Sequence, residues 1–183
     1  MALRELLTEK SDRVVGEWRE SILQDYSEEG ARLYGTELDP FANPVGNHLR
    51  SGTREALTEL LAGRDPAAIA GCLTEIVKIR SVQQFPASEG LAFVFRLKGA
   101  ARAALGEAAA DPDLRREWEE FDRTVDAVGL ACFDLYSEHR EKVYELRMNE
   151  TKRRVSWVID KLNQRDGGPG VNDTDPIENT SER

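Results

Sequence analysis

The chain has 183 residues, a length that suits one domain of ordinary size with an appendage. Its 34 acidic residues outnumber its 25 basic residues, which gives a net charge of -9. That balance argues against nucleic acid as the main partner, because nucleic-acid binding needs a basic face to displace counterions from phosphates. It also disfavours electrostatic attachment to an anionic membrane surface. The composition therefore indicates an acidic globular protein, and it names no activity.

The N-terminal segment lacks the features of a signal peptide. Glu5, Glu9 and Lys10 stand where such a peptide needs an unbroken apolar core. No stretch approaches the ~20 apolar residues that are needed to cross a bilayer. We therefore expect a cytoplasmic protein without membrane insertion.

The two cysteines, Cys72 and Cys132, lie in no CxxC motif and in no cluster of cysteine and histidine. A disulfide framework and a structural zinc site are therefore not expected. We interpret each cysteine as a small buried hydrophobic residue. The alternative is a redox-sensing thiol, which needs exposure and a lowered pKa.

Apolar residues recur at helical spacing from the start of the chain. A first helix is predicted to follow Ser11, a capping residue, and to carry an apolar stripe as far as Tyr26. A loop is expected next, because Gly30, Gly35 and the pair Asp39-Pro40 interrupt the pattern.

Three dipeptides predict further helix starts, because each places a capping side chain directly before a proline. They are Asn43-Pro44, Asp65-Pro66 and Asp111-Pro112. Pro86 is expected to end the preceding helix near Gln84. The helix after that proline is apolar around most of its circumference at first, which is typical of a central element.

The last helical segment shows a coiled-coil-like seam of apolar residues at alternating spacings of four and three. The seam comprises Leu114, Trp118, Phe121, Val125, Val128, Cys132 and Leu135. A helix over residues 112–163 would be about 78 Å long. It is expected either to bend back near Gly129 or to extend as a stalk. No convincing alternating pattern occurs, so the predicted fold class is all-α, a helical bundle with a long C-terminal stalk helix.

These patterns divide the chain into three predicted parts. Residues 1–135 form the helical module, and residues 136–163 form a charged stalk that continues its last helix. Residues 164–183 are rich in glycine, proline and polar residues, so we expect an acidic, disordered tail.

No catalytic motif is recognisable, and the sequence predicts neither an enzyme nor a metal site or cofactor. The number of helices invites comparison with globins, whose haem needs a proximal histidine. His48 and His139 are the two histidines of the chain. Each is interpreted as a partly exposed or interface residue, and haem ligation by either one is kept as an alternative.

Two loop-to-helix junctions, residues 41–46 and 79–88, combine capping residues, a proline and aromatic side chains. Helix capping and the packing of the aromatic side chains are a sufficient structural explanation for both junctions. The functional alternative is a site for a small anionic ligand or a partner, with Asn43, Arg80, Gln83 and Phe85 as its candidate residues. Arg80 and Gln83 lie one turn apart beside an apolar stripe, so they need hydrogen-bond partners if they are buried.

Three segments in this order resemble the RsbRD N-terminal domain family. They are DPFANPVG at 39–46, IRSVQQFPASEGLAFVFRLK at 79–98 and FDLYSEHREKVYELRMNETKRR at 133–154. The resemblance covers most of residues 1–163. It implies a globin-like sensor domain of bacterial stress signalling that generally lacks haem and tends to form dimers. In such regulators a linker helix and a STAS output domain follow, and no stretch of that size follows residue 163 here.

The resulting hypothesis is a stand-alone, non-catalytic sensory or regulatory module that forms a homodimer. Binding at the two junctions would shift helix packing and pass a signal through the C-terminal helix to a separate regulatory protein. Two alternatives stay open at this point: a globin-like protein that binds haem or another cofactor, and a scaffold that serves dimerisation or docking alone.

Overall fold

A computed structural model describes residues 2–36, 39–83 and 85–166, with side chains as far as Leu162. Within these residues every regular element is helical, which confirms the all-α prediction. None of the helices in this described part is long and apolar enough to span a membrane.

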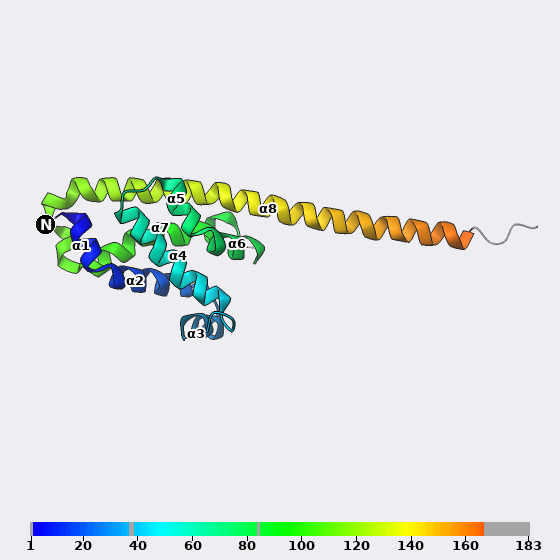
Figure 1. The fold of residues 1–183 in the computed structure, drawn as a ribbon, viewed down its shortest axis with the longest axis horizontal. Helices are drawn as coiled ribbons and strands as arrows, with labels where there is room; N and C mark the ends of the chain where they lie inside the picture. Colours follow the sequence, from blue (N-terminus) through cyan, green and yellow to red (C-terminus); the bar gives the residue numbers. More distant parts are fainter. Residues whose placement is uncertain (1, 37–38, 84, 167–183) are drawn as a thin grey trace, which may run out of the picture. The chain divides into compact units, whose positions relative to one another are not determined.

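The structure divides into two compact units, of which unit 1 ends at Val143 and unit 2 begins at Tyr144. Figure 1 shows the helices in chain order. They are α1 (Leu3–Glu9), α2 (Ser11–Leu23), α3 (Glu28–Thr36), α4 (Pro44–Leu61), α5 (Pro66–Cys72), α6 (Thr74–Val82), α7 (Ala87–Leu105) and α8 (Arg115–Asp166). Two short 3-10 segments, Gly106–Ala110 and Pro112–Leu114, join α7 to α8.

The capping pairs act as predicted at α4 and α5. The Asn43 side chain accepts a hydrogen bond from the Gly46 amide at 2.8 Å, and Asp65 accepts from two amides in the first turn of α5. Asp111 also caps, but the turn that it opens is the 3-10 turn Pro112–Leu114, and α8 begins directly after that turn, at Arg115. Each of the three prolines occupies the first position of its helix, where an amide would have no partner within the helix.

The predicted loop at Gly30 and Gly35 is wrong, because both glycines lie inside α3. Two glutamates occupy its first turn, where carboxylates are favoured by the helix dipole. At the other end, the Asn43 side chain donates to the carbonyls of Leu33 and Tyr34 at 3.1 and 3.3 Å. A side chain that lies outside the helix thus satisfies its terminal carbonyls, which offsets part of the cost of glycine.

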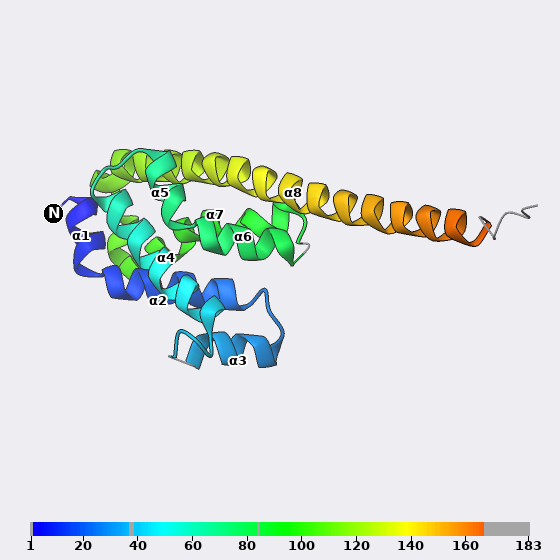
Figure 2. The same cartoon turned by 45° about the vertical axis from the view of Figure 1, so that its right-hand side comes forward.

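The core of unit 1 forms where α2 packs against α7 and α4 packs against α2, α5 and α6. Figures 1 and 2 place α7 between α2 and the N-terminal half of α8. Phe93 and Ala101 of α7 are fully buried, so the central position predicted for this helix is confirmed.

The first part of α8 closes unit 1 with the predicted seam, whose members are buried from Leu114 through Cys132. The helix runs through Gly129 without interruption, so the first of the two expected alternatives, a bend back at this glycine, does not occur. Gly129 instead allows a close approach, because a Cβ at this position would overlap the ring of Phe95. From Tyr144 onward, α8 belongs to unit 2. The predicted tail lies outside the described residues except for its first three positions, which continue α8.

Candidate functional site

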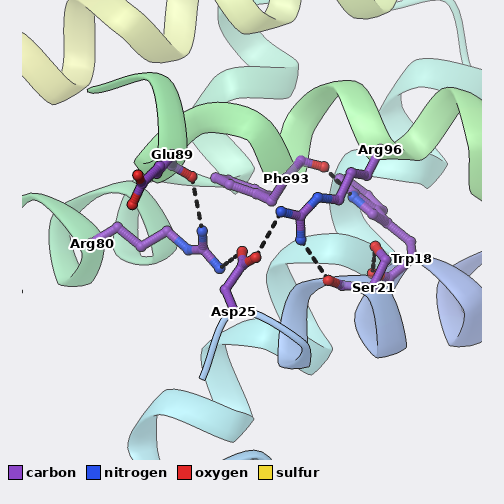
Figure 3. A network of polar contacts seen from close by, with 7 residues as sticks. All are labelled: Trp18, Ser21, Asp25, Arg80, Glu89, Phe93 and Arg96. Carbon is purple, nitrogen blue, oxygen red and sulfur yellow. Dashed lines mark hydrogen bonds and ion pairs between the residues drawn. The ribbon is translucent and has the colours of Figure 1, made fainter. Parts of the chain in front are cut away.

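A charged network lies inside unit 1 at the corner between α6 and α7, here defined as residues 80–83 and 85–90 (Figure 3). Its centre is Arg80, whose side chain has no exposed surface. One guanidinium nitrogen contacts Asp25 Oδ2 at 2.8 Å, and the other donates to the Glu89 carbonyl at 3.3 Å. Arg80 therefore ties the end of α6 to the segment after α2 and to the first turn of α7.

A second arginine, Arg96 of α7, binds the other oxygen of the same carboxylate. Its Nη2 lies 2.6 Å from Asp25 Oδ1, and its Nη1 donates to the Ser21 carbonyl of α2 at 2.5 Å. Burial alone would raise the pKa of Asp25, but the hydrogen bonds from Arg96 and Arg80 outweigh it and lower the pKa below its usual value. Asp25 is thus held as a carboxylate that neutralises part of the charge of two arginines.

Aromatic rings surround the rest of the Arg80 guanidinium. Its central carbon lies 5.2 Å from the ring centres of Phe85 and Phe93 and 5.5 Å from that of Tyr26. Burial raises the pKa of Tyr26. The Arg80 Nε is buried and has no hydrogen-bond partner among the described residues, so the rings substitute for water on that side.

The same corner is also held by α8. The Tyr136 hydroxyl donates to the Phe85 carbonyl, and Arg140 donates to the Ser81 carbonyl at 3.1 Å. Gly90 provides the space for the Tyr136 ring, since a Cβ there would stand 3.2 Å from it. The α6–α7 corner therefore lies between the Asp25 network on one side and α8 on the other.

The structure brings two of the four predicted site residues together, Arg80 and Phe85. Gln83 is exposed at the end of α6, although it lies one turn from Arg80. Asn43 is buried elsewhere, where it joins the end of α3 to the start of α4. A ligand- or partner-binding role for any of the four stays a prediction.

Neither histidine belongs to a cluster of metal-ligating side chains, as judged over residues 2–36, 39–83 and 85–162. His48 and His139 are both half-buried. Cys132 is fully buried and burial raises the pKa of its thiol to about 12, so it matches the interpretation as a hydrophobic residue. Cys72 is half-buried, and burial together with Glu55 and Glu59 raises its pKa.

A half-open cleft of about 360 Å³ lies at another end of unit 1 and includes none of the predicted site residues. Leu3, Leu7 and Phe121 contribute apolar side chains to its lining. Two of its charged groups already have partners, because Glu117 accepts from the Leu3 amide at 2.7 Å and Arg64 pairs with Glu59 at 3.1 Å. The cleft offers no convergent set of groups for a particular ligand.

The sequence interpretation missed Asp25, Arg96, Tyr136 and Arg140. A charged residue inside the apolar run LAFVFRL was a usable signal for Arg96, because a buried charge needs a partner. Tyr136 and Arg140 stand four residues apart on α8, which places them on one face. The pairing of Asp25 with two arginines depends on contacts across 55 and 71 residues, which no local pattern indicates.

Residues 12–151 match the family model described as the RsbT co-antagonist protein rsbRD N-terminal domain. The matched range contains every residue of the network and of its contacts with α8. No curated protein and no solved structure matches the chain.

Proposed function

The chain belongs to the RsbRD N-terminal domain family, and from that premise we propose that it is a non-catalytic regulatory module of bacterial stress signalling. It acts in the cytoplasm and passes a signal through α8 to a separate regulatory protein. In this proposal residues 1–135 receive the signal and residues 136–163 carry it. The globin-like character of the module belongs to the same proposal.

The observation that carries the proposal is the double attachment of the α6–α7 corner. Asp25 holds the corner through Arg80, while Tyr136 and Arg140 hold the backbone of the same corner from α8. A ligand or partner that displaces the corner must therefore alter the contacts of α8. Packed helices tend to change between discrete arrangements, so a small displacement at the corner favours a different register or rotation of α8.

Hydrogen–deuterium exchange on the full chain tests this coupling. Asp25→Asn removes the charge that both arginines need, and the expected result is faster amide exchange in α8 around Tyr136 and Arg140. Asp12→Asn is the matched control, because Asp12 also pairs with an arginine, Arg54, at 2.7 Å but on an exposed surface. Unchanged exchange in that part of α8, alongside faster exchange near residue 25, would contradict the proposal.

The proposal includes pairing with a second copy through unit 1. Leu130 is 70% exposed and Phe133 is 49% exposed on α8, and Phe95 of α7 lies on Gly129 beside them. Exposed apolar groups that gather on one face are typical of an interface. Light scattering on the full chain is expected to show a dimer that L130D converts to a monomer, whereas a monomeric parent chain would remove this part of the proposal.

A further inference from the structure

Unit 2 carries an apolar stripe whose side chains are exposed for about half of their surface. Six residues of α8 recur at alternating spacings of four and three, which is the repeat of a coiled-coil seam. They are Tyr144, Met148, Thr151, Val155, Val158 and Leu162, here called the unit 2 seam. At ~1.5 Å per residue this stretch is about 27 Å long.

The seam side chains are open to solvent. The exposed fraction of the five larger side chains of the seam ranges from 47% at Val158 to 59% at Met148. Thr151 is the polar member, and its hydroxyl donates to the Arg147 carbonyl at 2.9 Å. That bond satisfies the hydroxyl within the helix.

The residues that flank the seam are mostly basic. Arg147, Arg154 and Lys161 lie along one side, and Lys152 lies on the other between Glu145 and Ile159. Arg154 pairs with Glu150 of the same helix, and Lys161 lies over the Trp157 ring at 4.7 Å. Among the described side chains, Arg147 and Lys152 have no acid within 4.0 Å. This is a local excess of positive charge in a protein whose net charge is -9.

These flanks oppose pairing of the seam with a second copy. In a parallel pair of helices, Arg147 of one copy would face Lys152 of the other, because flanking positions contact across the seam. In an antiparallel pair, the side that carries Arg147, Arg154 and Lys161 would face itself. Like charges meet in both arrangements, and such contacts are destabilising.

We propose that the unit 2 seam binds an amphipathic helix of another protein, with apolar residues at its own seam and Asp or Glu at its flanking positions. Such a helix covers the exposed apolar side chains and places carboxylates opposite Arg147 and Lys152. The inference rests on the proposed function, in which α8 passes the signal to a separate protein, and it specifies the chemistry of that partner.

Two synthetic helical peptides of about 21 residues, three heptads, provide the test. Both carry leucine at the seam positions; one has glutamate at all flanking positions and the other has lysine. Fluorescence anisotropy with the full chain is expected to show that the acidic peptide binds at least about tenfold more tightly at about 0.15 M salt, with the difference reduced at about 1 M salt. Equal binding of the two peptides, or binding of neither, would overturn the proposal.

Matched variants separate the seam from general electrostatic attraction. Arg147→Glu reverses a flanking charge and is expected to weaken the acidic peptide about threefold to tenfold. Arg153→Glu makes the same change on the face opposite the seam and is expected to leave binding within about twofold. Val155→Asp places a charge in the seam and should abolish binding. Equal effects of the two arginine variants would show that the peptide does not use the seam.

Light scattering tests whether the seam is instead covered by a second copy of this chain. Val155→Asp is expected to leave the oligomeric state unchanged, and dissociation of a dimer by this variant would overturn the proposal. A failure of this proposal about the seam is distinguishable from a failure of the proposed function. Peptide binding reports on residues 144–162 alone, whereas the exchange experiment on Asp25→Asn reports on the α6–α7 corner and the part of α8 in unit 1.

Discussion

The α6–α7 corner of unit 1 and the seam of unit 2 use arginine in opposite ways. At the corner, Arg80 has no exposed surface and binds a carboxylate, a carbonyl and three aromatic rings. In unit 2, Arg147 lies in solvent beside exposed apolar side chains and no acid pairs with it in the described chain. A buried arginine with partners fixes the relative position of helices, whereas an exposed one is available to select a partner by charge.

The largest expected effect comes from removing the carboxylate at the corner. Asp25→Ala leaves the Arg80 charge buried without its counterion, so we expect a loss of about 3–5 kcal/mol in the free energy of unfolding. Urea denaturation followed by circular dichroism measures it. Asp126→Ala removes an ion pair with Lys98 on the surface and is expected to cost less than about 1 kcal/mol. Similar losses for both variants would remove the distinction between buried and exposed pairs.

Acid should weaken the α6–α7 corner, because the network depends on the charged form of Asp25. The pKa of Asp25 is lower in the folded protein than in the unfolded chain, so its contribution to stability is present above the unfolded pKa of about 3.9. It is lost as the pH falls through the lower, folded value. The stability difference between the parent chain and Asp25→Asn is therefore expected to shrink on acidification. A difference that stays constant down to strongly acidic pH would contradict the assigned direction of the shift.

A smaller effect is expected where α8 holds the corner. Tyr136→Phe removes the hydroxyl that donates to the Phe85 carbonyl and preserves the ring against Gly90. The expected cost is about 0.5–1.5 kcal/mol in the free energy of unfolding, the usual net value of one hydrogen bond. Tyr144→Phe is the matched control, because Tyr144 is 55% exposed, and it should change stability by less than about 0.5 kcal/mol.

The smallest effect on folding is expected in unit 2. Val155→Asp alters a side chain that is 53% exposed, so the unfolding transition of unit 1 should move by less than about 0.5 kcal/mol. Thermal unfolding monitored by tryptophan fluorescence checks this, because Trp18 and Trp118 lie in the core of unit 1. A marked destabilisation would mean that the seam is part of the folded core and not a free surface.

The sequence predicted those features of the fold that depend on neighbours along the chain. Asn43 and Asp65 cap the helices that their prolines open, and the buried seam of α8 follows its heptad spacing. Gly30 and Gly35 misled the prediction, because a capping group from outside the helix, Asn43, stabilises α3.

The site was predicted only in part, because several of its contacts join residues that lie far apart in the sequence. Arg80 stood out as a charge beside an apolar stripe, and Phe85 stood out as an aromatic side chain at a loop-to-helix junction. Their partners Asp25 and Arg96 come from other helices, and whether a charged side chain is buried depends on packing that local spacing does not encode. Gln83 shared the local pattern of Arg80 and is exposed.

A double-mutant cycle between Asp25→Asn and Tyr136→Phe tests the coupling of the corner to α8 most directly. The two side chains act on opposite sides of the α6–α7 corner, on Arg80 and on the Phe85 carbonyl. If the corner couples the two attachments energetically, the effects of the two variants on the free energy of unfolding should depart from additivity by more than about 0.5 kcal/mol. Effects that add within about 0.3 kcal/mol would show that the two attachments are independent and would contradict the proposed route of the signal.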